Sequence, residues 1–176
     1  MKMKWFVLFV RTGYEEKTSE YLSKCLDNEK YSVFRPLVQY YFPRAGNVKI
    51  EIKAMFQGYV FIETDTDSNE VPIELLEAAK KVTSIYKILY NDYTLAAVAD
   101  NDRIFLDSLL NEARVLERSI GVIRGDKVII HQGPMIGKEG LIRKIDRHKR
   151  KAFIEASMFN GIITKMEVPL EIISKL

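Results

Sequence analysis

The chain has 176 residues and a mass of 20.4 kDa, with 47% hydrophobic and 29% charged residues. This size allows one medium domain or two small ones, and nine Gly with five Pro exclude a collagen-like or low-complexity protein. The net charge of +3 conceals a split, because residues 1–118 hold 16 Lys and Arg against 18 Asp and Glu, whereas residues 119–176 hold 11 against 6. Seventeen of the 19 aromatic residues also lie in residues 1–118, so we predict two domains.

The first residues imitate a signal peptide, with a basic head and an apolar run from Trp5 to Val10. The run has six residues and ends at Arg11, whereas an export signal needs about 7–15 apolar residues. We therefore predict a buried strand over residues 5–10. No stretch approaches the roughly 20 apolar residues of a membrane span, so we expect a soluble, cytoplasmic protein without membrane contact.

Helical spacing follows this strand. Between residues 15 and 28 one stripe of mostly apolar side chains is flanked by charged positions, as on an amphipathic helix. The stripe consists of Thr18, Tyr21, Leu22, Cys25 and Leu26. We expect Cys25 to be a small core residue, and a single cysteine excludes an internal disulfide and a Cys-based zinc site.

Strand patterns occupy the rest of the first half. Residues 31–34 are extended, and residues 40–53 indicate a hairpin arm that turns near residues 45–47. Residues 56–62 predict another buried strand, and residues 84–89 a further one.

Two more helices are predicted. Pro72 stands at a first helical turn, and a third, short helix covers residues 101–110. The stripe of the helix after Pro72 consists of Ile73, Leu76, Ala78 and Ala79. The order β-α-β-β-β-α-β favours an α+β fold with the helices on one face of an antiparallel sheet.

The pattern weakens over residues 111–119, which we interpret as a linker between a domain of residues 1–110 and one of residues 120–176. Short strand patterns follow, separated by Gly-Pro, Gly-Lys, a basic turn and Asn-Gly. They cover residues 127–131, 139–145, 152–156 and 161–168, with a final turn at 170–173. Closure removes exposed strand edges, so we predict a small five-stranded β-barrel.

The residues give little support for catalysis. The two histidines, His131 and His148, have no Cys, Asp or Glu at metal-ligand spacing, and no phosphate-binding loop, dinucleotide motif or nucleophile elbow occurs. Residues 65–69 begin like a calcium loop, but the sixth position is Glu70 instead of Gly and the twelfth is Leu76 instead of Glu. We predict no enzyme activity, no metal and no cofactor.

The strongest local feature is a basic run at residues 143–151, where six Lys and Arg and His148 stand against one Asp. Clustered positive charge attracts phosphates and releases counterions; the alternative is a merely solvated turn. Only Phe153 and Phe159 are aromatic among residues 119–176, so a platform for stacking single strands is poorly supplied. We expect phosphate and groove contacts with a folded RNA or a duplex.

The first half carries many more aromatic residues than a domain of this size is expected to bury. Most should lie in the core. An apolar surface patch rimmed by polar residues would mark a protein partner.

Two sets of motifs, one in each half of the chain, carry a resemblance to a known family. The first half contains Trp5-Phe-Val-Leu, Gly13-x-Glu15 and Phe56-Gln-Gly-Tyr-Val60, and the second contains residues 120–145, with several glycines and Gly133-Pro134. Together they resemble the NusG family of transcription factors. The first set is similar to its amino-terminal (NGN) domain, although Gln57 stands where the family usually has Pro, and the second is similar to its SH3-like KOW motif. The resemblance covers nearly the whole chain in the expected order.

The resemblance implies a first domain that docks on the clamp helices of RNA polymerase through an apolar surface and contacts upstream or non-template DNA. It implies a KOW domain that recruits other factors or RNA. By position, the polymerase-binding residues would be Trp5, Phe6, Phe56, Gly58 and Tyr59. We expect a monomer that is associated with the bacterial nucleoid during transcription.

Within the family, the dense basic turn is more similar to the LoaP-type paralogs, which act as processive antiterminators on chosen operons. For these the resemblance implies recognition of a structured leader RNA by the basic KOW surface. The phosphate contacts would then be Arg143, Lys144, Arg147, His148, Lys149, Arg150 and Lys151. RfaH-like paralogs instead read DNA through the first domain and can refold the second as helices, whereas the glycines and β-branched strands of residues 125–168 favour a barrel.

Three alternatives remain. The first is a general elongation or pausing factor whose KOW domain contacts a ribosomal protein. The second is a ribosome-associated KOW protein without polymerase contact. The third and least favoured is an enzyme.

Overall fold

The computed structural model describes residues 3–44, 46–88, 90–91, 94–95, 97–159 and 161–175. Internal contacts divide the chain into two compact units. The first unit comprises Met1–Pro36 and Ala54–Ile104, and the second comprises Leu37–Lys53 and Phe105–Leu176. The hairpin arm thus groups with the carboxy-terminal strands. The division of the sequence into domains at residues 111–119 stays a prediction.

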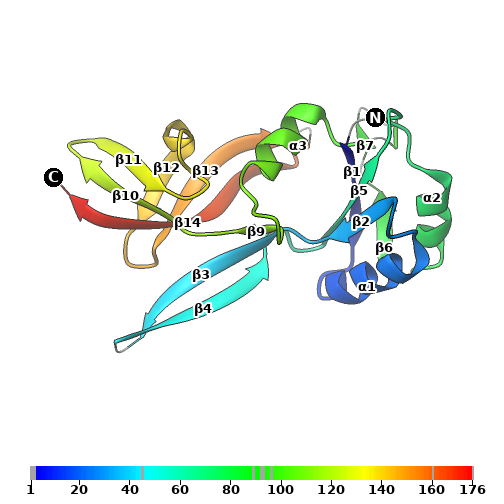
Figure 1. The fold of residues 1–176 in the computed structure, drawn as a ribbon, viewed down its shortest axis with the longest axis horizontal. Coiled ribbons are helices and arrows are strands. Elements are labelled where there is room, and N and C mark those ends of the chain that lie inside the picture. Colours follow the sequence, from blue (N-terminus) through cyan, green and yellow to red (C-terminus); the bar gives the residue numbers. More distant parts are fainter. Residues whose placement is uncertain are drawn as a thin grey trace. The chain divides into compact units, whose positions relative to one another are not determined.

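The first unit is built on a four-stranded antiparallel sheet with the order β2-β5-β1-β6 (Figure 1). Its strands are β1 (Met3–Val10), β2 (Tyr31–Phe34), β5 (Tyr59–Asp65) and β6 (Ile85–Ile88). β1 is internal, as its apolar run predicts, and its register with β5 places Leu8 opposite Val60 and Phe9 opposite Tyr59. The predicted α+β class is confirmed.

Two helices, α1 (Glu15–Cys25) and α2 (Ile73–Lys80), pack against this sheet through a shared core. Leu22 of α1 and Leu75 of α2 are both fully buried in it. The strands contribute alternate residues to the same core, among them Phe6, Leu8, Val10, Val60 and Ile62. Because successive strand side chains point to opposite faces, Trp5, Val7 and Phe9 belong to the other face. The short strands β7 (Tyr90–Asn91) and β8 (Thr94–Leu95) and helix α3 (Asp100–Asp107) follow in the chain.

The buried residues of α1 and α2 differ from the predicted apolar stripes near the ends of each helix. In α1, Thr18 and Leu22 are buried but Tyr21 and Cys25 are exposed, so Cys25 is not a core residue. The helix ends at Cys25, and the extended backbone of Leu26 returns the chain to the core. In α2 the stripe is Leu75, Ala78 and Ala79, while Ile73 is 70% exposed at the first helical position.

The predicted strand over residues 56–62 begins later, at Tyr59, because Gln57 and Gly58 form a turn. Gly58 has a φ of +82°, which a strand residue does not adopt. The strand predicted over residues 84–89 is present as β6, and Leu89 lies outside the described residues.

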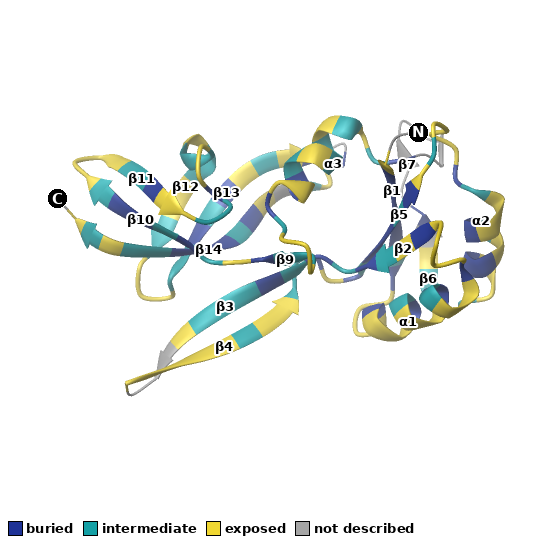
Figure 2. Cartoon of the chain, viewed as in Figure 1, coloured by how far each residue is buried: buried dark blue, intermediate teal, exposed yellow. Residues whose placement is uncertain are grey.

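The hairpin arm belongs to a second, three-stranded sheet with the order β4-β3-β9. It consists of β3 (Leu37–Arg44), β4 (Asn47–Ala54) and β9 (Val115–Leu116). Of the predicted turn, Ala45 lies outside the described residues. β9 pairs in parallel with the start of β3, so the segment predicted as a linker contains a short strand. β4 is an edge strand, and Figure 2 shows it largely exposed.

The carboxy-terminal strands form a five-stranded sheet with the order β11-β10-β14-β13-β12. They are β10 (Ser119–Arg124), β11 (Lys127–Gln132), β12 (Ile142–Asp146), β13 (Lys151–Met158) and β14 (Ile163–Lys175), with a 3-10 turn at Glu139–Leu141 before β12. β10 and β14 are parallel and the other pairs are antiparallel. The order ends at β11 and β12, so a closing pair is not among the pairings of the described strands.

Several details of these strands were mispredicted. The strand expected over residues 139–145 begins at Ile142, because Glu139–Leu141 form the 3-10 turn. β10 was not recognised as a strand, and the turn expected at residues 170–173 is absent because β14 continues through it to Lys175. β14 pairs with β13 up to Pro169 and with β10 from Leu170 onward. One long strand therefore joins both halves of the sheet and fixes the ends of the turn between β12 and β13.

Within the described ranges, no helix is long and apolar enough to cross a membrane.

Candidate functional site

The basic run of residues 143–151 covers most of β12, the turn of residues 147–150 and the first residue of β13, and local hydrogen bonds hold this turn in shape. We call the whole run the basic turn. The backbone N–H of Lys149 donates to Asp146 Oδ1 at 2.9 Å. That bond, with the nearby Lys and His side chains, lowers the pKa of Asp146. Arg150 has a φ of +49°, and its carbonyl accepts from the N–H of Leu170 on β14 at 3.0 Å. The turn is therefore tied to the long strand and presents its side chains from a fixed backbone.

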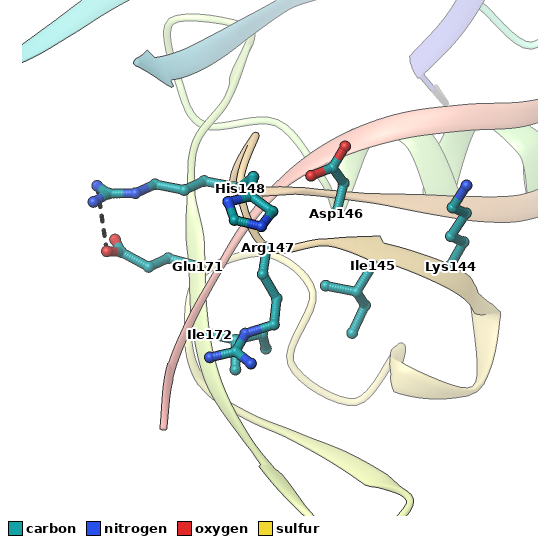
Figure 3. Close-up of a pocket in the computed structure, with 8 residues that line it drawn as sticks. Lys144, Ile145, Asp146, Arg147, His148, Glu171 and Ile172 are labelled. Atoms are coloured by element: carbon teal, nitrogen blue, oxygen red, sulfur yellow. Dashed lines mark ion pairs between the residues drawn. The ribbon is translucent and has the colours of Figure 1, made fainter. Parts of the chain in front are cut away.

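Beside the turn is a solvent-open hollow of about 650 Å³. Residues of β12, the turn and β14 line it: Lys144, Ile145, Asp146, Arg147, His148, Arg150, Glu171 and Ile172 (Figure 3). Cationic side chains outnumber the two carboxylates there. The hollow is thus a concave surface of net positive charge, which suits a phosphate-bearing ligand.

Three of the seven predicted phosphate contacts are already paired with carboxylates. Arg143 Nε lies 2.9 Å from Glu155, Arg150 Nη1 lies 3.3 Å from Glu171, and Lys151 Nζ lies 2.6 Å from Glu167. The dashed line in Figure 3 marks the pair with Glu171. These carboxylates cancel part of the positive charge that the sequence alone indicates. The three cations help to hold the sheet and the turn together.

The other four predicted contacts have exposed side chains. They are Lys144, Arg147, His148 and Lys149. Lys144 Nζ lies 6.0 Å from the centre of the Phe153 ring. Arg147, His148 and Lys149 make no ion pair with any part of the chain that the structure describes. They are the groups of the basic turn that an added phosphate would meet first.

In the first unit, a carboxylate joins two parts of the NGN-like sequence. Glu15 Oε2 accepts from the N–H of Gly13, and Glu15 Oε1 accepts from the N–H of Gly58, both at 2.7 Å. Gly58 in turn accepts from the N–H of Val10 at 2.8 Å. Burial raises the pKa of Glu15, but its hydrogen bonds from backbone N–H groups and the charge of Arg35 outweigh this, so the pKa is lowered. We call this arrangement the Glu15 clamp.

The Gly58→Ala variant is expected to destabilise the first unit more than Gly13→Ala. Both glycines have a positive φ, +82° and +87°, which costs an L-residue about 1–2 kcal/mol. A Cβ at Gly58 would also lie 3.3 Å from the carbonyl oxygen of Val10, whereas one at Gly13 meets nothing within 4 Å. Urea unfolding followed by fluorescence of Trp5, the single Trp, measures the difference. Equal losses would show that the close approach at Gly58 is relieved without cost.

Two of the predicted polymerase contacts lie in the core. Trp5 and Phe6 are both 0% exposed, with Phe6 on the helix side of the sheet. The indole N–H of Trp5 donates to Glu63 Oε2 at 2.7 Å. Neither ring is available to touch another protein, so both are corrected to core residues. Both faces of β1 are covered, because Phe6 packs in the core with the helices and Trp5 packs against the rings of Phe34 and Phe61 on the other face.

Two of the remaining predicted polymerase contacts, Phe56 and Tyr59, pack in a cluster of aromatic rings that the sequence analysis did not identify. Phe56 is buried beside Tyr59, with ring centres 6.5 Å apart, and Tyr59 packs on Phe9 at 5.5 Å. Phe9 packs on Tyr86 at 5.6 Å, and Tyr86 is 61% exposed. Phe9 and Tyr86 were missed as site residues. The available signal was strand alternation, which places Phe9 opposite Tyr59 only once the register is known. We call Phe9, Tyr59 and Tyr86 the aromatic face.

Among the described residues, no group of three or more His, Cys, Asp and Glu could hold a metal ion.

Comparison with known proteins adds a family match. The family model described as transcription termination factor nusG matches residues 3–104. The transcription termination/antitermination protein NusG of Thermus thermophilus is 24% identical over 181 residues, covering 98% of this chain and 96% of that protein.

Two solved structures are similar at lower identity. One, described as domain interaction in Thermotoga maritima NusG, has a TM-score of 0.54 and 18% identity, covering 98% of this chain and 95% of that one. It supports the fold. The MjSpt4:Spt5 complex in conformation A has a TM-score of 0.35 and 17% identity, with coverage of 94% and 92%, which is too weak a likeness to bear on the fold.

Proposed function

This chain belongs to the NusG family of transcription factors, and we propose that it is a non-catalytic elongation and antitermination factor that binds RNA polymerase and a structured leader RNA. In this proposal residues 1–110 form the polymerase-binding NGN domain, residues 111–119 the linker and residues 120–176 the RNA-binding KOW domain. The hairpin arm of β3 and β4 belongs to the NGN sequence but groups with the carboxy-terminal strands in the structure. It acts as a monomer in the bacterial cytoplasm and promotes read-through of terminators in chosen operons, as LoaP-type paralogs do.

The observation that carries RNA binding is the set of exposed cations on a rigid turn. Arg147, His148 and Lys149 project from a turn that Asp146 and β14 hold in place. Because the backbone is already ordered, phosphate binding does not have to order a loop, which lowers the entropic cost of association. The concave hollow beside the turn suits a rounded RNA backbone.

For polymerase binding we propose the aromatic face in place of Trp5 and Phe6. Phe9 and Tyr59 are half-buried and Tyr86 is exposed, so part of each aromatic ring is accessible to solvent on the surface of the sheet. Exposed aromatic residues of this kind are typical anchors of protein interfaces. Two buried residues contact or position this face. Phe56 packs against the Tyr59 ring, and Gly58, next to Tyr59 in the chain, is held by the Glu15 clamp.

Replacing Tyr86 by alanine is expected to weaken binding of the full chain to the host RNA polymerase by about fivefold or more, because aromatic anchors contribute more than about 1 kcal/mol each. Titration of labelled protein with polymerase measures this. The matched control is Tyr21→Ala, which removes a ring that is 37% exposed on α1. Equal affinities of the two variants would remove the aromatic face from the proposal.

The proposed mechanism is a shift in populations. The first domain binds the active polymerase conformation better than the paused one, which favours elongation without any catalytic step. The second domain holds the RNA, and the linker raises the effective concentration of each domain near its own target.

A second candidate is a general elongation factor whose KOW domain binds a protein. The ion pairs of Arg143, Arg150 and Lys151 favour it, because they reduce the free charge of the basic turn. Titration of the full chain with structured leader RNAs separates the two. Selective binding supports the RNA reader, and absence of RNA binding supports the protein-binding factor.

A further inference from the structure

The second unit contains another pocket, which joins the hairpin arm to the basic turn. It has a volume of about 230 Å³. Its lining comes from β3, β4, the basic turn and β14: Tyr40, Phe42, Lys53, Lys149, Lys151 and Glu167. Two aromatic rings and three lysines therefore surround one small space. We call it the arm pocket.

Side-chain contacts hold the arm beside the turn. The Arg118 guanidinium lies 4.3 Å from the centre of the Tyr41 ring on β3, and it also pairs with Glu171 on β14. Glu171 binds Arg150 of the basic turn as well. These contacts link β3, which carries Tyr40 and Phe42, to β14 and the basic turn, which carry Glu167 and Lys149.

One wall of the arm pocket is aromatic. Tyr40 and Phe42 stand two residues apart on β3 and so share a face, with ring centres 6.4 Å apart and planes inclined by 34°. Burial, with the charge of Glu167, raises the pKa of Tyr40. Phe42 is 37% exposed, and Lys53 Nζ lies 5.5 Å from its ring centre. Phe42 therefore offers an accessible ring with a cation at its side.

Of the three lysines that line the arm pocket, two are already paired with carboxylates. Lys151 is paired with Glu167, and Lys53 Nζ lies 2.8 Å from Glu51. Lys149 makes no ion pair within the described part of the chain. An anion that enters the arm pocket would therefore meet the Lys149 ammonium first, and a planar ring attached to that anion would meet Phe42.

We propose that the arm pocket binds an unpaired nucleotide of RNA next to a base-paired stem, with its base stacked on Phe42 and its phosphate at Lys149. This inference rests on the proposed RNA-binding function and extends it. Every base offers a π-face, so aromatic rings beside cations are the usual means of holding single-stranded nucleic acid. The carboxy-terminal sequence alone lacks these rings, and the hairpin arm supplies them.

The test compares two RNAs on the full chain: a blunt RNA stem-loop and the same stem-loop with a short unpaired pyrimidine tail. Stacking of one base contributes about 1–3 kcal/mol, which predicts that the tail raises the affinity of the wild-type chain by about 5- to 150-fold. The Phe42→Ala variant should lose this increase and keep the affinity for the blunt stem. Phe42→Trp should restore the increase, and Ile50→Ala, which removes an exposed side chain of the same hairpin, should leave it unchanged.

Several results would overturn the inference. If the tail gives no increase in the wild-type chain, or if Phe42→Ala weakens the blunt and tailed stems equally, no nucleotide stacks at Phe42. Failure of the wild-type chain to bind either RNA would reject the proposed RNA-binding function together with the inference, whereas binding without a tail effect rejects the inference alone.

Discussion

Replacing Glu15 by alanine is expected to lower the free energy of unfolding of the first unit by about 2–4 kcal/mol. The Glu15 clamp satisfies the backbone N–H groups of Gly13 and Gly58, and alanine would leave both without this acceptor. An unsatisfied buried donor costs about 1–3 kcal/mol. The Gly58 bond is buried, while the Gly13 bond is partly buried, so water recovers part of the loss at Gly13. Urea unfolding followed by Trp5 fluorescence reports on this unit, because Trp5 lies in its sheet.

The adjacent glutamate provides the matched control. Glu16 pairs with Arg35 through a side chain that is 71% exposed, and exposed pairs contribute about 0–1 kcal/mol. Glu16→Ala should therefore change the unfolding free energy little. If both variants lose the same amount, the effect comes from helix α1 in general, and the clamp has no special role.

The clamp also predicts a dependence on pH. The pKa of Glu15 in the folded chain lies below its ordinary value of 4.5. A depressed pKa means that its contribution to stability is present above pH 4.5 and is lost as the pH falls through the folded-state pKa. The stability difference between the wild-type chain and Glu15→Gln should therefore shrink with acidification below pH 4.5. A difference that stays constant as the pH falls well below 4.5 would contradict a carboxylate clamp.

Local patterns predicted most of the elements but not their pairing. The apolar run at residues 5–10 and the alternation in residues 40–53 both lead to strands. Alternation cannot show that β14 continues through residues 170–173, because that part is stabilised by pairing with β10, about 50 residues earlier in the chain. Nor does it show that the hairpin arm contacts the carboxy-terminal strands. These are long-range contacts, which short windows of sequence do not contain.

The candidate site shows the same limit at the level of single residues. A family-like motif drew attention to Trp5 and Phe6, but burial on both faces of β1 makes them core residues. The run of Lys and Arg in the sequence indicated the basic turn. Counting charges cannot show that Glu155, Glu167 and Glu171 pair with three of its cations. These carboxylates come from β13 and β14, and only the strand register brings them beside the turn.

Removing the two exposed Lys and Arg charges that follow Asp146, in the double variant Arg147→Ala, Lys149→Ala, is expected to weaken binding of a structured leader RNA by about 15- to 30-fold near 0.15 M salt. Each phosphate contact contributes a slope of about 0.7–0.9 to the dependence of log K on log salt concentration, so the slope should also fall by about 1.4–1.8. Both side chains are exposed and without an ion pair among the described residues, so their loss leaves the fold intact. Titrations at several salt concentrations measure the affinity and the slope together.

The matched control removes the same net charge elsewhere. Lys24→Ala with Lys80→Ala takes two exposed lysines from helices α1 and α2 of the first unit. If RNA binding depends on direct phosphate contacts at the turn, this control keeps both the affinity and the salt slope. If binding depends only on net charge, the two double variants weaken equally, and the basic turn is then a solvated surface rather than an RNA site. Arg143→Ala gives an intermediate test, since its guanidinium would have to leave Glu155 to reach a phosphate. Its effect should be smaller than that of either single change at Arg147 or Lys149.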